Sequence, residues 1–147
     1  MSTQAATGGV AATAGTTAPD PRAQLVERDG QVLLAGGRCR ACRDRTPYLV
    51  PRCPVCGEET DPADMGPGGT VFSGTVLRIG VPGRRPPMVL AYVDVDDGPR
   101  ILAHVNGSDQ APAPMARVRL VGQTPDGDPL VSEAPDAASP ASPGGAS

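Results

Sequence analysis

The sequence contains no tryptophan and no lysine, and its aromatic residues are limited to two tyrosines and one phenylalanine. A core without large aromatic side chains must be built from Val, Leu, Ile and Ala, and β-branched side chains favour short strands over long helices. All thirteen basic residues are arginine, which together with the abundant Ala, Gly and Pro indicates a GC-rich genome rather than a function. The net charge of -3 argues against a general nucleic-acid-binding protein.

Long apolar runs are also missing. Residues 1–19 have neither the charged side chain nor the apolar run of a secretory signal, and no other stretch approaches the roughly twenty apolar residues of a membrane span. We therefore expect a cytoplasmic protein that does not enter a membrane. In that compartment, paired cysteines are more typical of metal ligands or redox thiols than of disulfides.

The composition divides the 147 residues into four segments. Residues 1–21 and 133–147 are rich in small residues and proline, which predicts disordered tails. Residues 22–66 contain all the cysteines, and residues 67–132 change to short apolar segments separated by turn residues.

Alternation of apolar and polar residues predicts five strands in the third segment. The clearest are residues 88–95 and 100–105, joined by Asp97-Gly98, which is typical of a tight hairpin turn. Further strands are expected over residues 70–79, 116–123 and 128–132. The expected inward-facing side chains of the two clearest strands are Val89, Ala91, Val93, Val95, Ile101, Ala103 and Val105.

Five short strands indicate a small closed barrel of the OB type, because closure removes edges that a small sheet could not protect. A small sandwich is the alternative fold. In the first of these strands, the pattern sets Phe72 and Val76 against Val71, Leu77 and Ile79, so Phe72 is a possible core residue.

The four cysteines form two C-x-x-C pairs, Cys39 with Cys42 and Cys53 with Cys56, separated by ten residues. Structural zinc takes four tetrahedral ligands and prefers thiolates, so the spacing predicts a zinc ribbon in which Gly57 permits a left-handed turn. Iron in a rubredoxin-like site would use the same ligands. A redox C-x-x-C is typically single and lies at a helix N-terminus, a context not found here. Four thiolates leave no open position, so we expect a structural role for the metal.

Residues 22–57 carry seven arginines against three acidic residues. A zinc tetrathiolate adds two negative charges, which leaves the segment positive by about two. The arginines either compensate the thiolate charge or meet an anionic partner, such as a phosphate of coenzyme A or an acidic protein face.

No pattern of catalytic residues stands out. The single histidine, His104, is out of phase with the apolar side of its strand and is expected to be a surface residue. There is no phosphate-binding glycine motif and no acidic cluster with calcium-loop spacing. Arg84 and Arg85 fall in the loop between the first two barrel strands, where they either contact a ligand or remain solvated.

Three stretches together resemble one family. They are LLAGGRCRACRDRTPYLVPRCPVCGEE (33–59), GPGGTVFSGTVLR (66–78) and PPMVLAYVDVDDGPRILAHV (86–105). Their order resembles the zinc-ribbon/OB-fold accessory proteins of acyl-CoA enzymes, in which a rubredoxin-like ribbon precedes a five-stranded OB barrel. The family's usual aromatic-containing helix before the ribbon is replaced here by residues 24–34, which contain no aromatic residue.

The resemblance implies a non-catalytic accessory subunit of a thiolase- or ketosynthase-type acyltransferase complex that handles acyl-CoA or acyl-carrier thioesters. It also implies a thiolase-fold or hotdog-fold hydratase partner and structural zinc on the four cysteines. The alternative is a single-stranded nucleic-acid binder. Such a protein needs stacking aromatics and a basic groove, whereas the barrel segment offers only Phe72 and Tyr92, and its six arginines are matched by six aspartates.

Overall fold

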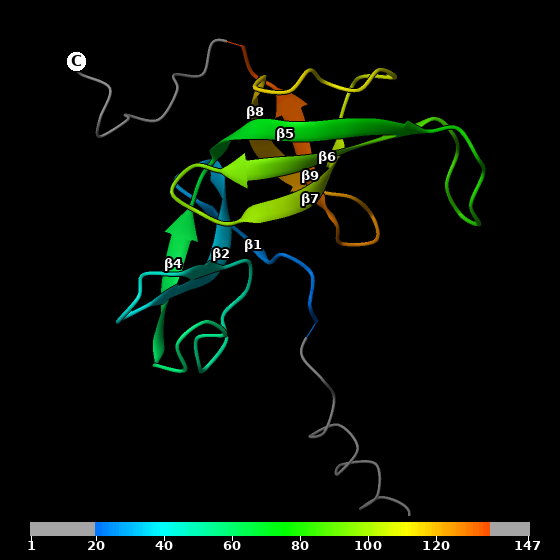
Figure 1. Ribbon diagram of the computed structural model, residues 1–147. Helices are drawn as coiled ribbons and strands as arrows, with labels where there is room; N and C mark the ends of the chain where they lie inside the picture. Colours follow the sequence, from blue (N-terminus) through cyan, green and yellow to red (C-terminus); the bar gives the residue numbers. More distant parts are fainter. Residues whose placement is uncertain (1–19, 136–147) are drawn as a thin grey trace, which may run out of the picture.

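The computed structural model describes residues 20–135, which form nine β-strands and no helix (Figure 1). Within this range no helix has the length and apolarity needed to cross a membrane. The predicted mainly-β fold, with a cysteine segment followed by a barrel, is confirmed. Most of the two predicted tails, residues 1–19 and 136–147, lies outside the described residues.

The first sheet is built around one long strand. Strand β2 (Gln31–Cys39) pairs antiparallel with β1 (Leu25–Arg28), β3 (Arg45–Thr46) and β4 (Thr60–Met65). β1 and β2 form a hairpin whose turn residues, Asp29 and Gly30, have positive φ angles of 51° and 77°. Both central residues of a type I′ turn adopt such angles. The segment without aromatic residues, 24–34, therefore lies in a β-hairpin.

The second sheet is a closed barrel of five strands. These are β5 (Gly68–Leu77), β6 (Met88–Val95), β7 (Arg100–Val105), β8 (Arg117–Gln123) and β9 (Pro129–Glu133). The strand order around the barrel is β5-β6-β7-β9-β8, with β7 and β9 parallel and all other pairs antiparallel. The barrel prediction is thereby confirmed over the sandwich.

The alternation predicted in β6 and β7 is observed. Each side chain expected to face inward is at most 8 % exposed, and these side chains form the barrel core with Val71, Val118, Leu120 and Val131. Because the barrel closes on small aliphatic side chains, no tryptophan is needed to fill it.

The expectation of Phe72 as a possible core residue is wrong. The register of β5 against β6 shifts between Val71 and Ser73, so Phe72 lies in a β-bulge with 53 % of its surface exposed. A bulge inserts one extra residue and so reverses which positions of the strand face inward. Val71 and Val76 consequently both pack on the core, and Ile79 lies beyond the end of β5, 70 % exposed.

The two sheets share one hydrophobic core. Leu34 on β2 and Met65 on β4 are 0 % and 2 % exposed and belong to the same buried cluster as the barrel valines. A Cβ added to Gly98, in the β6–β7 turn, would lie 3.2 Å from the Met65 side chain. The first sheet is therefore packed against one end of the barrel.

Candidate functional site

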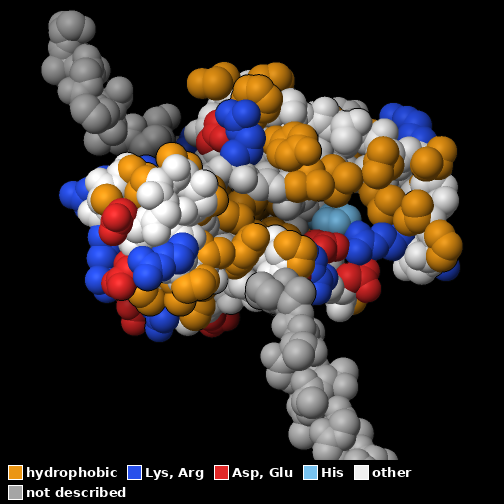
Figure 2. Space-filling view, turned by 60° about the horizontal axis from the view of Figure 1, so that its bottom comes forward, with side chains coloured by type: hydrophobic (Ala, Val, Ile, Leu, Met, Phe, Trp, Pro, Cys, Tyr) orange, Lys and Arg blue, Asp and Glu red, His pale blue; other side chains and the backbone are white. Residues whose placement is uncertain are grey.

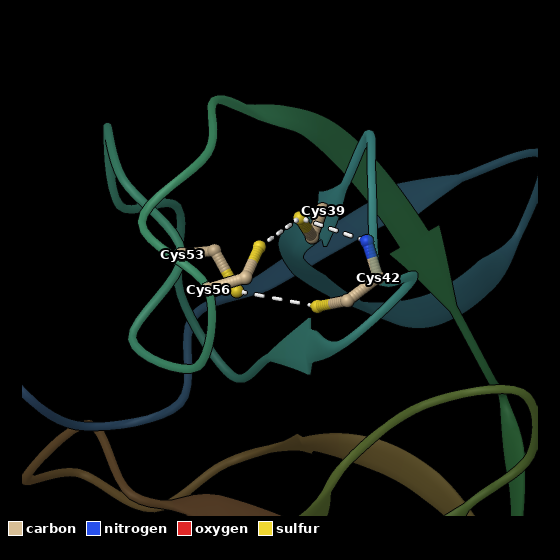
Figure 3. Close-up of side chains that lie close together, drawn as sticks. All are labelled: Cys39, Cys42, Cys53 and Cys56. Carbon is tan, nitrogen blue, oxygen red and sulfur yellow. Dashed lines mark hydrogen bonds between the residues drawn. The ribbon is translucent and has the colours of Figure 1, made fainter.

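All four cysteines converge at the end of the first sheet that lies away from Leu34. Their sulfur atoms are within 4.8 Å of one another, and the cysteines lie on two turns that face each other (Figure 3). Cys39 ends β2 and is buried, as is Cys53, whereas Cys42 and Cys56 are exposed. The sequence prediction that these four residues meet at one point is therefore correct.

The sulfur positions fit a tetrahedral metal. Cys39 Sγ lies 3.4 Å from Cys56 Sγ, and Cys42 Sγ lies 3.6 Å from Cys53 Sγ. Zinc–sulfur bonds of about 2.3 Å place two ligands of a tetrahedron about 3.8 Å apart. The nearest sulfur pairs therefore need to move by only a few tenths of an ångström to hold one ion.

Backbone N–H groups donate hydrogen bonds to the sulfur atoms of the buried cysteines. Ala41 N and Cys42 N donate to Cys39 Sγ at 3.3 and 3.4 Å, and Val55 N donates to Cys53 Sγ at 3.3 Å. The bond from Cys42 N, partly opposed by desolvation, is the main cause that lowers the pKa of Cys39 to about 6.

Cys42 has the opposite tendency. The N–H of Asp44 lowers the pKa of its thiol, but desolvation and the sulfurs of Cys53, Cys39 and Cys56 raise that pKa to about 12. Four thiolates crowded together repel one another, and a divalent cation removes this repulsion because it holds all four in the deprotonated form.

Left-handed residues form the turns at the cysteines. Arg43 follows Cys42 with a φ of 67°, and Gly57 follows Cys56 with a φ of 83°, as expected for that glycine. Gly57 N donates to the Cys53 carbonyl at 2.9 Å and closes the second turn. On β2, a Cβ at Gly36 would lie 2.0 Å from the Thr46 carbonyl oxygen, so only glycine lets β3 approach this closely.

The donor set therefore suits a soft tetrahedral ion, and Cys39, Cys42, Cys53 and Cys56 are the residues that could hold it. Zinc and iron both accept this arrangement. An ion with four protein ligands has no position for a substrate, so the centre would support the fold rather than perform chemistry.

A second group of polar side chains gathers on the barrel around Arg84. Its Nη2 donates to Asp126 Oδ2 and Asp128 Oδ2, both at 2.7 Å, and its Nη1 lies 2.7 Å from His104 Nε2. Arg84 comes from the β5–β6 loop, while Asp126 and Asp128 come from the β8–β9 loop. The arginine therefore joins the two loops across β7.

Arg84 and Asp128 each stabilise the charged form of the other. The hydrogen bond from Arg84 is the main cause that lowers the pKa of Asp128, and the same bond raises the pKa of Arg84. Because a guanidinium can only donate, His104 Nε2 must accept from it. The His104 side chain is 17 % exposed. It faces away from the barrel core as predicted, and Arg84 and Asp128 cover part of it.

The sequence singled out Arg84 but not its partners Asp126 and Asp128. Residues 84, 104 and 128 are brought together only by barrel closure, in which β7 pairs with β9 through His104 and Leu130. No local signal in the sequence reports such a contact. Arg85 is exposed, and within residues 20–135 it has no ion pair or hydrogen bond.

A groove of about 490 Å³ opens beside this cluster. Its walls are mainly apolar and include Leu77, Val81, Met88, Leu90 and Leu102, and Arg84, His104 and Asp128 also line it. Figure 2 shows the pale-blue histidine next to charged side chains, with apolar side chains spread over the neighbouring surface. In OB folds this face, between the first and fourth loops, is a common binding surface.

An exposed apolar patch lies on the outer side of β5, β6 and β7. It consists of Phe72, Tyr92 and Leu102, which are 53, 49 and 47 % exposed. Tyr92 is the register partner of both Leu102 on β7 and Ser73 in the bulge beside Phe72. The guanidinium of Arg100 stacks 3.6 Å above the centre of the Phe72 ring and also pairs with Asp94.

Comparison with known proteins agrees with this architecture. Residues 63–123 match the family model described as ChsH2, C-terminal OB-fold domain. Among solved structures, a chain described as "Ltp2-ChsH2(DUF35) aldolase" is 25 % identical, with a TM-score of 0.57, over 69 % of this chain and 84 % of its own. No curated protein matches the sequence significantly.

Proposed function

From the premise that this chain resembles the zinc-ribbon/OB-fold accessory proteins, with a barrel that matches the ChsH2 OB-fold domain, we propose that it is a non-catalytic subunit of an acyl-thioester enzyme. Its partner would be a thiolase-fold or ketosynthase-like enzyme, or a hotdog-fold hydratase. The complex would act on acyl-CoA or acyl-carrier thioesters in the cytoplasm.

The observation that carries this proposal is the combination of a cysteine cluster and a barrel in one chain. The likeness to the solved chain described as "Ltp2-ChsH2(DUF35) aldolase" covers 69 % of this chain and 84 % of that chain, so it extends beyond the barrel. A likeness over one barrel alone would indicate only a fold that serves many functions.

Two features of the site fit a supporting role. The four thiols point at one another, and all four would be ligands of one metal ion. His104 Nε2 already accepts a hydrogen bond from Arg84, so it is not free to take a proton from a substrate. We propose zinc as the metal, because it is the usual ion of structural tetrathiolate sites.

The exposed patch of Phe72, Tyr92 and Leu102 is our candidate contact with the partner enzyme. Aromatic and aliphatic side chains half exposed on a rigid sheet are typical of protein interfaces. The adjacent groove has apolar walls that suit the acyl or pantetheine arm of a thioester.

Arg84 and Arg85 remain our candidates for contact with an acyl-CoA. Arg85 is the better of the two, since the Arg84 guanidinium is already bound by two carboxylates. If Arg85 contacts coenzyme A, Arg85→Ala will weaken use of acyl-CoA by the complex without separating its subunits, whereas unchanged kinetics would remove this residue from the proposal.

The alternative function, binding of single-stranded nucleic acid, is not favoured by the comparisons. Exposed Phe72 and Tyr92 could stack on bases, but the arginine next to them is paired with Asp94. Oligonucleotide binding with a steep salt dependence would support this alternative.

A tagged pull-down from the native host tests the proposed function. We expect a stoichiometric thiolase-fold protein that co-elutes with the chain in one size-exclusion peak and is identified by mass spectrometry. A monomer, or a chain that retains nucleic acid, would contradict the proposal. Cell fractionation of the same host tests the cytoplasmic location.

A further inference from the structure

Two arginines of the first sheet pair with a single aspartate of the barrel, and a third arginine lies in the same hollow. Asp97, in the β6–β7 turn, accepts from Arg38 Nη2 at 2.8 Å and from Arg45 Nη2 at 2.7 Å. These residues and Arg43 line a hollow of about 320 Å³ between the sheet and the turn. We propose that this hollow binds a phosphate group, with Arg38, Arg43 and Arg45 as its ligands.

The charge of the hollow is unbalanced. Three guanidinium groups line it with one carboxylate, so its lining carries a net charge of +2. Each guanidinium has five N–H donors, yet Arg38 and Arg45 each give only one nitrogen to Asp97. Within residues 20–135, Arg43 has no ion pair or hydrogen bond from its side chain. Apart from the Nε atoms of Arg38 and Arg45, which are buried, the remaining donors of the three arginines are available to a further acceptor.

The strand register makes this arrangement costly without an anion. Arg38 on β2 and Arg45 on β3 are directly opposed register partners. Like charges in such positions repel and destabilise a sheet. Asp97 offsets part of the repulsion, but its side chain is 66 % exposed, so solvent screens its effect. A bound dianion would offset the remainder.

The arginines do not simply neutralise the cysteine cluster. Arg38 and Arg45 direct their Nη2 atoms to Asp97, and the hydrogen bonds found at the Cys39 and Cys53 sulfurs come from backbone N–H groups or from the other cysteines. The positive charge is thus concentrated in a concave surface next to the metal centre.

The chemistry of the hollow favours phosphate over a carboxylate. Guanidinium groups bind phosphate through pairs of parallel N–H bonds, and a tetrahedral oxyanion can accept from several arginines at once. A volume of about 320 Å³ is large enough for a pyrophosphate. This inference is independent of the accessory function proposed above.

Calorimetric titration of the metal-loaded full chain tests the site, with inorganic phosphate, pyrophosphate and ADP as probes. We expect pyrophosphate to bind more tightly than phosphate. Binding of ADP as tight as that of pyrophosphate would identify a phosphate ester as the natural ligand class, and weaker binding of ADP would identify a free anion. No binding of any of the three at millimolar concentration would overturn the proposal.

Three variants locate the binding. Arg43→Ala should weaken pyrophosphate binding about tenfold, the loss of one charge-assisted contact, and because Arg43 is exposed the variant should keep its metal and fold. Asp97→Asn removes the competing carboxylate and should tighten binding severalfold. Arg119→Ala, which removes an exposed arginine of β8 outside the hollow, should leave the affinity unchanged. Equal losses in Arg43→Ala and Arg119→Ala would show non-specific attraction and overturn the site.

Discussion

Leu34 and Met65 are register partners across β2 and β4, and both are buried in the core that also contains the barrel valines. The first sheet therefore depends on the barrel for its hydrophobic burial, while its far end depends on the cysteine cluster. The loss of Met65 and the loss of the metal should therefore have different effects on the first sheet.

Met65→Ala should destabilise the whole described fold. Met65 is 2 % exposed, and truncation of a buried methionine to alanine costs about 2–4 kcal/mol because it leaves a cavity. Urea denaturation followed by circular dichroism should show one transition shifted to lower concentration. Met115→Ala is the control, since Met115 is 77 % exposed and should have no effect. An unchanged midpoint for Met65→Ala would show that the two sheets are not coupled through this residue.

Removal of the metal should unfold the cysteine-bearing end of the first sheet and leave most of the β signal of the barrel. Chelation and Cys53→Ser should have the same effect, because a metal held by the four cysteines would supply the folding free energy of a segment with few apolar residues. Hydrogen exchange should accelerate over residues 39–57 and remain slow in β6 and β7. We expect metal analysis to find one zinc per chain, and partner binding should be lost with the metal. Unchanged affinity of the metal-free protein for its partner would exclude this end as the docking element.

Arg84→Gln should lower the melting temperature by a few degrees at neutral pH, because it releases the β5–β6 loop from the β8–β9 loop. Arg84 lowers the pKa of Asp128 in the folded protein, so this contribution is present above the ordinary carboxyl pKa of about 4 and is lost as the pH falls through the lowered value. The difference in melting temperature between wild type and variant should therefore be constant from about pH 5 to 8 and shrink below about pH 4.

Arg85→Gln is the matched control for this pH series. It removes the neighbouring charge without a contact among the described residues, and it should not change the melting temperature at any pH of the series. A difference for Arg84→Gln that does not shrink as the pH falls below about 4 would show that its effect is not electrostatic.

Leu102→Asp should weaken binding of the proposed partner by at least about tenfold, because it places a charge within the exposed patch beside Tyr92. Leu102 is 47 % exposed, so the fold should tolerate the change. Val121→Asp on β8, where Val121 is 41 % exposed, provides the control. Surface plasmon resonance with the partner recovered from the host gives the affinities, and equal effects of both variants would place the interface elsewhere.

The parts of the fold predicted from sequence are those specified by local periodicity or by ligand spacing. Apolar and polar residues alternate regularly in β6 and β7. Each C-x-x-C pair is itself a local pattern that specifies the turn orienting its two sulfurs. β4 was missed because its sequence, TDPADM, reads as a loop, yet it pairs with β2 over six residues. Its pairing depends on Met65, whose burial is decided by the barrel and not by the strand itself.

The errors in the barrel have a similar cause. The bulge at Phe72 depends on how β5 meets both β6 and β8, and an unbroken alternation in the sequence cannot reveal it. Likewise, the contacts of His104 arise from the closure that sets β9 beside β7. A contact between two residues that are far apart in the chain produces no local sequence pattern at either residue.

The cysteine-bearing segment is attached to the barrel at both of its ends. At its start, Ala23 is buried in the shared core and Arg22 donates to the Asp126 carbonyl, and at its finish Gly66 N donates to the Asp96 carbonyl. A metal-free segment is thus a closed loop rather than a free arm, and the chain entropy it can gain on unfolding is limited by its fixed ends. The barrel thereby lowers the entropic cost of metal capture, because it keeps the two cysteine pairs at a high effective concentration for each other.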